Sequence, residues 1–419
     1  MAFQRKYKIL GLLLMLICVQ LNAQEIYSLK KALQTAKANN TRLKSEKFDI
    51  NIAESDILTA KLRPNLSFSN ESLQLINSSE FTSNTSWYNG ENRETFWELS
   101  KPIQLAGQRK NKIEIANKNV EFTEKNYAEV ERHLFLDVAE KWLQVWAAQK
   151  QLDIIDIAKD NVDSLVKTNQ RRYESQVITQ TELFRTELLA KQYATQFKTA
   201  KQEVNSNQRE LGYLLGSPKE VEIDTTAHFL FKIPDQVNDL VDKALEKRSD
   251  IQSTKSLIEV SKSQIDLEKS LAYPTPEIGV IYNPQGTVPF LGISFSIDLP
   301  VFDRNQGEIQ KSRHRQEQAE QQLKSLKKEL YTEVTVAHEN YKVQQQNKED
   351  FKELLEQSQT ILNNVKHAYL KGGTSIIDFL EAQRSWLETQ QQYYDVLESY
   401  RQSYISILYA SGLINQLAL

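Results

Sequence analysis

Side chains that commonly bind metals or act as nucleophiles are few in this sequence and poorly spaced for either task. The histidines do not recur at the short intervals that hold a metal ion; they are His133, His228, His314, His338 and His367. The only cysteine, Cys18, and both methionines, Met1 and Met15, lie in the first 23 residues. No Gly-rich phosphate loop, nucleophile elbow or paired catalytic constellation occurs. We therefore expect no enzymatic activity, no cofactor and no bound metal.

The composition favours long helices over a turn-rich globular fold. The chain has 419 residues with 12 Gly and 9 Pro, well below the usual shares of about 7% and about 5%. Its 52 Lys and Arg residues nearly balance its 55 Asp and Glu residues, for a formal net charge of −3. Because a nucleic-acid binder needs a strong basic field, we expect no nucleic-acid partner.

The N-terminal segment has the pattern of an export signal. Basic residues precede the apolar run Ile9–Val19, and the small residue Ala23 follows at the expected cleavage site. The run is shorter than a membrane-spanning helix, which needs about 20 residues. A membrane anchor and lipidation at Cys18 are the two alternatives. We expect residues 1–23 to be a signal peptide.

The rest of the sequence has the pattern of one unit used twice. Gly216 falls on Gly412 at an offset of 196 residues, and apolar residues spaced by seven largely coincide at the same offset. Chance is a weak alternative over such a length. We expect two structural repeats, residues 24–238 and 239–419.

Within each repeat the hydrophobic period changes in the same order. An amphipathic helix leads to a β-hairpin, which leads to a long helix and then to a returning helix. The predicted helices are residues 29–62 and 239–271, 105–172 and 305–370, and 179–214 and 375–411. The longest would extend for roughly 100 Å, and their heptad spacing predicts coiled-coil packing.

Period-two alternation marks the strands, which we expect within residues 66–103 and 276–302. It is clearest from Leu291 to Leu299, and a Ser/Asn/Thr-rich loop at residues 77–94 separates the first two strands. Four strands are too few to close a barrel in a membrane, where open edges are not tolerated. Either three copies join to supply twelve strands, or each hairpin is a half-buried part of a soluble protein.

Four segments of the chain form a specific pattern through their order and spacing. They are Ser28–Leu33 through Asn39 and Asn40, Leu62–Ser67, Leu299–Asp303, and the stretch from Tyr369 through Gly372 to Asp378–Arg384. Together they resemble the TolC-like outer-membrane efflux proteins, and the resemblance extends over essentially the whole mature chain. The Leu-Pro-Val-Phe-Asp strand end looks most like the heavy-metal and multidrug efflux branch.

The resemblance implies a fold that is mostly α with a small β part, in which strand hairpins and long coiled-coil helices are duplicated. It implies a homotrimer with a twelve-stranded β-barrel in outer-membrane lipid, continued by an α-helical barrel through the periplasm. It also implies a passive exit duct in a tripartite efflux system. The implied partners are a periplasmic adaptor (membrane fusion protein) and an inner-membrane RND-type transporter.

The same resemblance places a periplasmic gate at the turns between the long and the returning helices. Asp378 and Glu381 match the positions of its acidic ring, and Glu182 is the first-repeat counterpart of Asp378. Tyr369 matches a tyrosine that ties neighbouring helix pairs together. Thr374 stands where the best-known members carry a basic residue, so a salt-bridge lock is not expected. The alternative for the three carboxylates is that acidic residues are simply favoured at helix N-termini.

Four aromatic residues on or near the strands are candidates for a belt at the membrane surface. They are Trp87, Trp97, Tyr282 and Phe290. Amphipathic rings collect at that depth, although aromatic residues are also common in strands that meet no lipid. We expect the belt.

Two other classes of protein share some of these features. A periplasmic coiled-coil adaptor has one long helical hairpin, whereas this chain has two in tandem. A structural coiled-coil protein accounts for the long helices but not for the alternation from Leu291 to Leu299. Both remain alternatives to the duct.

Overall fold

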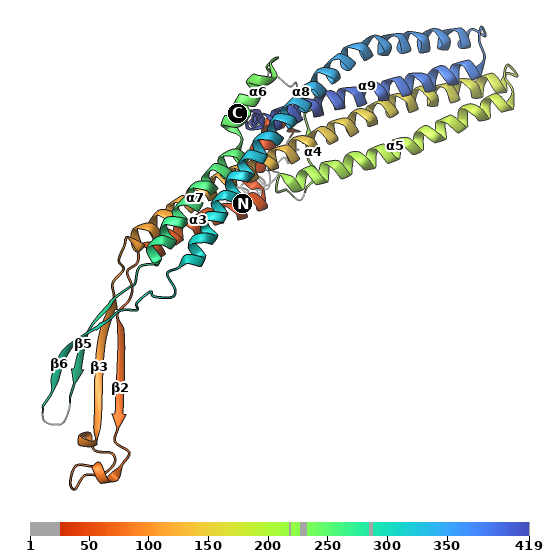
Figure 1. Ribbon diagram of the computed structural model, residues 1–419. Helices are drawn as coiled ribbons and strands as arrows, with labels where there is room; N and C mark the ends of the chain where they lie inside the picture. The colour runs from red at the N-terminus through yellow and green to blue at the C-terminus, as the bar shows by residue number, and fades with distance from the viewer. Residues whose placement is uncertain (1–25, 218, 227–232, 285–287, 419) are drawn as a thin grey trace, which may run out of the picture. The chain divides into compact units, whose positions relative to one another are not determined.

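The computed structural model describes residues 26–217, 219–226, 233–284 and 288–418 (Figure 1). The predicted signal peptide, with Cys18, lies outside the described residues. The chain divides into two compact units, each of which takes segments from both halves of the sequence. The helical unit comprises the residues up to Lys44, Val130–Lys247 and Leu330–Leu419, and the sheet unit comprises Ser45–Glu129 and Arg248–Glu329.

Two helical hairpins form most of the helical unit (Figure 1). Long helices α4 (Gln108–Glu174) and α8 (Gln306–Leu370) are followed by returning helices α5 (Gln180–Leu214) and α9 (Ile376–Ala410). The predicted bounds of these four helices agree to within a few residues. The smaller elements are β1 (Ile26–Tyr27), α2 (Leu29–Asn39), β4 (Glu222–Ile223, parallel to β1), α6 (Val237–Lys247) and the short η3 (Ile414–Ala418). None of the described helices has the length and apolar character needed to cross a membrane.

The four helices share one apolar core near their turns. Its members are Ile154, Ala158, Val162 and Leu165 of α4, Leu189 and Tyr193 of α5, Leu362 and Tyr369 of α8, and Ile376, Phe379, Trp386 and Leu387 of α9. Within α4 the members lie three or four residues apart, which places them on one helix face. Full burial of such a side chain contributes roughly 1.5–3 kcal/mol, so this core holds the two hairpins together.

Both returning helices end at a glycine in the left-handed conformation. Gly216 after α5 has a φ of 72°, and Gly412 after α9 has a φ of 69°. After each glycine, the next amide donates to a carbonyl five residues earlier, at 2.8 Å and 2.7 Å respectively. Glycine is favoured in this conformation because it has no Cβ to clash with the backbone. The pair that first indicated the offset of 196 residues thus has the same local structure.

The helices predicted at residues 29–62 and 239–271 are each broken into two, so this prediction was wrong. The first becomes α2 and α3 (Thr41–Lys61), and the second becomes α6 and α7 (Ser249–Leu271). Non-helical backbone interrupts both, with ψ of 125° at Asn40 and 128° at Arg248.

The break at Asn40 depends on a contact that is distant in sequence. The Asn40 side chain accepts a hydrogen bond from the Leu43 amide at 3.0 Å, and it donates to the Leu214 carbonyl at 2.9 Å. It therefore supplies hydrogen-bond partners for a free amide at the start of α3 and for a free carbonyl at the end of α5. Leu214 lies 174 residues away, so the hydrophobic period of residues 29–62 does not predict this break.

The sheet unit contains one four-stranded antiparallel sheet with the order β2-β3-β5-β6. The strands are β2 (Ser67–Gln74), β3 (Arg93–Pro102), β5 (Glu277–Asn283) and β6 (Phe290–Ser296). Both predicted hairpins are present, and the pairing of β3 with β5 joins them. The alternation extends to Leu299, but β6 ends at Ser296 because its partner β5 begins at Glu277, after a proline.

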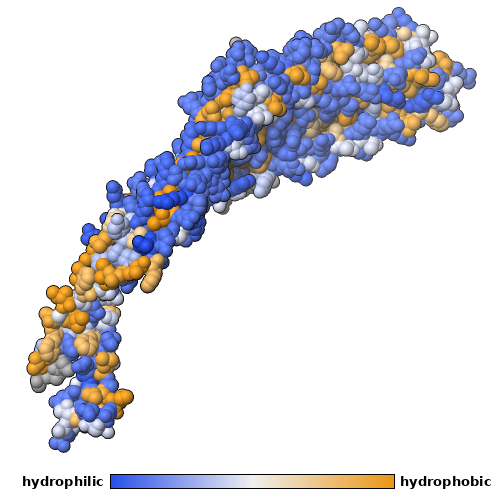
Figure 2. Space-filling view, in the orientation of Figure 1, coloured by the Kyte–Doolittle hydropathy of each residue, from blue (hydrophilic) through white to orange (hydrophobic). Residues whose placement is uncertain are grey.

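The two faces of this sheet differ sharply. Residues paired directly across strands share a face, so the register gives one mainly apolar face, on which Asn70 lies opposite Trp97. The apolar side chains of this face are Phe68, Trp97, Leu99, Ile278, Val280, Tyr282, Leu291, Ile293 and Phe295. Every one of these side chains is at least 39% exposed. Figure 2 shows hydrophobic residues gathered over β5 and β6. The opposite face carries mainly serine, glycine and glutamate residues, as the alternation predicted.

Residues 75–92, between β2 and β3, form an ordered loop with the short turns η1 (Ser78–Glu80) and η2 (Gly90–Asn92). The buried Asn92 holds it together. Its Oδ1 accepts from the Thr82 amide at 3.0 Å, and its Nδ2 donates to Thr85 Oγ1 at 2.8 Å. The polar side chains of this loop thus form hydrogen bonds within the loop itself.

Candidate gate at the helix turns and candidate lipid face of the sheet

Tyr369, the predicted gate tyrosine, is buried near the C-terminal end of α8. Its ring stacks on Phe379 of α9, with centroids 5.6 Å apart and an interplanar angle of 6°. Its hydroxyl donates to Asn169 Oδ1 of α4 at 2.9 Å. Within one chain, Tyr369 therefore connects the two helical hairpins.

Asn169 extends this connection to the returning helix of the first hairpin. Its Nδ2 donates to Thr186 Oγ1 at 2.9 Å, and this hydroxyl donates to the Glu182 carbonyl at 3.0 Å. Asn169 and Thr186 are fully buried, where an unmet polar group costs about 1–3 kcal/mol. The sequence analysis missed both residues, since 200 residues separate Asn169 from Tyr369. Asn169 lies among polar residues at positions 167–172, and Thr186 lies between Arg185 and Glu187, so neither leaves a local signal of its burial in the sequence.

Arg172 also contacts the tyrosine. Its guanidinium carbon lies 4.7 Å from the centroid of the Tyr369 ring, a cation–π distance. Arg172 Nη1 is buried and has no hydrogen-bond partner among the described residues. Burial raises the pKa of Tyr369, and the charge of Arg172 opposes this shift only in part. Tyr369 is thus a neutral hydrogen-bond donor at physiological pH.

Asp378 belongs to a capping box at the start of α9. The Ser375 hydroxyl accepts from the Asp378 amide at 3.2 Å, and Asp378 Oδ2 accepts from the Ser375 amide at 3.2 Å. The same oxygen accepts from the Thr374 hydroxyl at 2.7 Å. Hydrogen bonds from Thr374 and Ser375 lower the pKa of the exposed Asp378 carboxyl. Thr374 thus binds the acid through an uncharged hydroxyl, and not through a salt bridge.

Glu182 has the equivalent position at the start of α5. Its Oε2 accepts from the Thr179 amide at 2.7 Å, and its own amide donates to the Thr179 hydroxyl at 3.2 Å. The predicted correspondence between Glu182 and Asp378 therefore has a structural counterpart, since each is the third residue of its helix. Both acids cap a helix, which is the alternative role that the sequence left open.

Glu381 is exposed one turn after Asp378, and Arg384 lies 3.6 Å from its carboxylate. A pair this exposed is worth at most about 1 kcal/mol. The structure brings Tyr369 into the packed core and places the three acids around the two turns. Among these acids, Glu182 is close enough to influence Tyr369, whose pKa its negative charge helps to raise.

The four predicted belt residues do not share one location. Trp97 and Tyr282 are directly paired on the apolar face, where Trp97 also stacks on Phe68 with centroids 5.5 Å apart. Phe290 pairs with Asn283 and so belongs to the opposite face. Trp87 lies in the loop between β2 and β3, with its ring 6.1 Å from that of Tyr88. Trp97 and Tyr282 thus form a short aromatic row.

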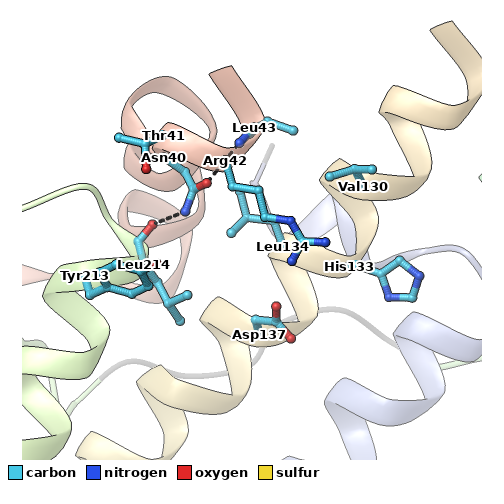
Figure 3. A pocket seen from close by; sticks show the side chains of 10 residues that line it. All are labelled: Asn40, Thr41, Arg42, Leu43, Val130, His133, Leu134, Asp137, Tyr213 and Leu214. Atoms are coloured by element: carbon cyan, nitrogen blue, oxygen red, sulfur yellow. Dashed lines mark hydrogen bonds between the residues drawn. The ribbon is translucent and has the colours of Figure 1, made fainter. Parts of the chain in front are cut away.

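The helical unit also has a cavity of about 410 Å³ between the α2–α3 junction, α4 and the end of α5 (Figure 3). Arg42, His133 and Asp137 line it. Partial burial raises the pKa of Asp137, while the charges of His133 and Arg42 oppose the shift. None of the predicted site residues lines this cavity. Because both basic and acidic side chains line it, the cavity favours neither anionic nor cationic ligands.

The fold defines a class: a subunit in which two long helical hairpins accompany a sheet whose exposed face is apolar. The sequence matches the family described as "Outer membrane efflux protein" over residues 32–217 and 240–413. The chain belongs to this family of outer-membrane channel proteins. It is therefore an outer-membrane efflux protein and not an enzyme, and the predicted TolC-like relationship is confirmed.

Similar proteins fall within the same class. The cobalt-zinc-cadmium resistance protein CzcC of Cupriavidus metallidurans is 21% identical over 88% of this chain and 86% of its own length. The pyoverdine export outer membrane protein OpmQ of Pseudomonas putida is 23% identical over 67% of this chain and 62% of its own length. A membrane protein of Pseudomonas aeruginosa has the same fold, with a TM-score of 0.77, 16% identity, and coverage of 92% of this chain and 91% of that chain.

Proposed function

We propose that three copies of this chain form an exit duct that passively conducts exported substrates through the outer membrane. The observation that carries the proposal is the sheet, with its exposed and mainly apolar face and its two outer strands, β2 and β6, each unpaired on one side in the described part of the chain. An exposed apolar face of this kind suits lipid. Pairing β2 of one copy with β6 of the next removes every edge and closes a twelve-stranded barrel.

In this assembly the polar face of the sheet lines the lumen, and the helical hairpins continue the wall into the periplasm as an α-helical barrel. The two repeats, residues 24–238 and 239–419, supply equivalent hairpins to this wall. The buried contact from Tyr369 to Asn169 holds them in fixed register within each copy. The duct itself performs no energy-consuming step.

We further infer a tripartite system, in which a periplasmic adaptor joins the helix turns to an inner-membrane RND-type transporter. The relatives are named for cobalt-zinc-cadmium resistance and for pyoverdine export. The similarity therefore supports an efflux role more firmly than any one cargo. The heavy-metal and multidrug branch is the assignment we favour.

The assembly is tested on protein extracted from outer membranes in mild detergent. We expect a trimer by native mass, gel migration that changes on heating, and discrete conductance in planar bilayers. A monomer or dimer that forms no channels would contradict the duct and favour an adaptor or a structural coiled coil.

We propose that Asp378 and Glu182, with Glu381, also form the acidic ring of the gate. Three copies would bring like charges together around a narrow opening and favour cations. Their part in capping calls for two double variants. D378A/E182A removes charge and caps, whereas D378N/E182Q removes charge and keeps groups that accept hydrogen bonds.

We expect both double variants to reduce cation selectivity in planar bilayers, and the alanine pair also to raise leakage. A change in selectivity in both double variants would show the role of the negative charge. Leakage that rises only in the alanine variant would show the role of the helix caps. Unchanged conductance and selectivity in both would contradict the gate assignment.

A further inference from the structure

All six charged residues of the four strands are sorted by face. The register places Glu71, Glu94, Glu98 and Glu277 on the polar face. Arg93 and Lys101, the two basic residues, both lie on the apolar face with Trp97 and Leu99. Any lipid next to the apolar face would therefore meet only positively charged residues of the strands. The inference below rests on the proposed function, in which this face contacts lipid.

The apolar face changes character in rows along the strands. Leu99, Val280 and Ile293 form one row. Trp97, Tyr282 and Leu291 form the next toward the loop, with Asn70 paired to Trp97 on its other side. Beyond these apolar rows, Ser72 pairs with Thr95, and Gln74 pairs with Arg93. The order of aliphatic, aromatic, hydroxyl and cationic side chains matches the change from hydrocarbon to headgroup in a bilayer.

Arg93 lies at the depth of the headgroups. It is four residues beyond Trp97, or about 13 Å along a strand at about 3.3 Å per residue. With a strand tilt of about 40°, this becomes roughly 10 Å along the membrane normal. The headgroup region of a bilayer begins within that distance of an aromatic row.

The guanidinium of Arg93 is held but not neutralised. Its carbon lies 5.6 Å from the centroid of the Tyr88 ring, and it forms no ion pair with any residue that the structure describes. Tyr88 is 75% exposed and its neighbour Trp87 is 55% exposed. Gln74 Nε2 donates to the Trp87 carbonyl at 2.6 Å, which holds this part of the loop beside the start of β3.

We propose that Arg93, with Tyr88 and the hydroxyl row of Ser72 and Thr95, binds the phosphate of an anionic lipid headgroup in the leaflet next to this loop. A guanidinium gives a planar pair of donors that fits two phosphate oxygens. Ser72 Oγ and Thr95 Oγ1 lie 3.3 Å apart and share one hydrogen bond, which leaves one hydroxyl of the pair to donate one row closer to the hydrocarbon. The occupant is a membrane lipid, because the site lies on the same face of the sheet as the apolar rows.

The test uses the purified full-length protein in zwitterionic detergent. Native mass spectrometry counts bound lipid A that carries its phosphates, against the same lipid after chemical dephosphorylation. We expect the phosphorylated lipid to bind about tenfold more tightly, a typical gain for a charge-assisted contact. R93Q should lose most of this preference, and R93K, which keeps the charge, should retain part of it.

Lys198→Gln is the matched control, because it removes one exposed positive charge from α5 in the helical unit. It should keep the preference of the unaltered protein. Equal binding of both lipids to the unaltered protein, or the same preference in R93Q as in K198Q, would overturn the site.

Conductance of the same preparations separates this inference from the proposed function. Conducting trimers of both the unaltered protein and R93Q, with no preference for phosphorylated lipid, would overturn only the lipid site. Absence of trimers and channels in the unaltered protein would overturn the duct and the lipid face together.

Discussion

The turns that join α4 to α5 and α8 to α9 have the same backbone but different residues. Gln176 in the first turn has a φ of 59°, and Gly372, 196 residues later, has a φ of 79°. The residue after each donates its amide to a carbonyl five residues earlier, at 2.8 Å in both turns. A glutamine in this conformation bears a strain of about 1–2 kcal/mol that a glycine avoids. The first turn therefore keeps its shape through the contacts around it.

The tyrosines just before these turns show a second difference. Tyr173 and Tyr369 occupy the same position in their helices, but Tyr173 is 37% exposed and Tyr369 is 3% exposed. Only Tyr369 reaches across to the other hairpin, through Asn169. The second hairpin thus supplies the connecting side chain, and the first supplies the polar pocket that receives it. The two repeats thus have the same backbone conformation at their turns, but each supplies a different partner of the hydrogen bond that connects the hairpins.

The largest effect should come from truncating these two tyrosines. Tyr369→Ala removes a buried ring and leaves Asn169 with an unmet hydrogen bond, so we expect a loss of about 3–5 kcal/mol in unfolding free energy. Tyr173→Ala should cost less than about 1 kcal/mol. Denaturant unfolding of the detergent-solubilised protein, followed by far-UV circular dichroism, measures both. Equal losses would contradict the unequal roles of the two tyrosines.

A smaller difference should appear at the turns themselves. Gly372→Ala should cost about 1 kcal/mol, because a Cβ would meet no atom within 4 Å and only the backbone conformation is unfavourable. Gln176→Gly should change stability by under about 0.5 kcal/mol, because the relief of strain is offset by a more flexible unfolded chain. The same unfolding measurement applies. A neutral Gly372→Ala would show that the left-handed turn carries no strain.

The smallest effect concerns pH and the cap of α9. Hydrogen bonds from Thr374 and Ser375 lower the pKa of Asp378. The stabilisation is therefore complete above about pH 4, the usual pKa of an aspartate, and is lost as the pH falls through the lowered value. D378N should remove this dependence. The check is the change in thermal midpoint between neutral and acidic pH, and equal slopes for the two proteins would contradict the role of the cap.

Local sequence signals predicted the elements better than the contacts between them. The long helices and the strand hairpins follow from period and turn residues, and Gly216 and Gly412 mark equivalent helix ends. The break at Asn40 and the bond from Tyr369 to Asn169 were missed. Each joins residues far apart in sequence, and no periodicity within a segment encodes such a pair.

The candidate sites show the same limit. Asp378 and Glu182 were predicted from a motif and a repeat offset, and their capping boxes follow from the neighbouring Ser375 and Thr179. The sorting of charge on the sheet was not predicted, because it needs the register of β3 against β5. That register depends on long-range pairing, and a slip by one residue would exchange the two faces.

The central claim is that β2 of one copy pairs with β6 of the next, and cysteine cross-linking tests it most directly. Cys18 is the one cysteine of the sequence, so in a C18A background a single engineered pair reports one contact. We would place one cysteine at Ser67 or Ser69 in β2 and the other at Ser294 or Ser296 in β6, all on the polar face. The account predicts that oxidation in outer membranes gives a covalent trimer for at least one pair. Monomers alone with every pair, in protein shown to be folded, would contradict it.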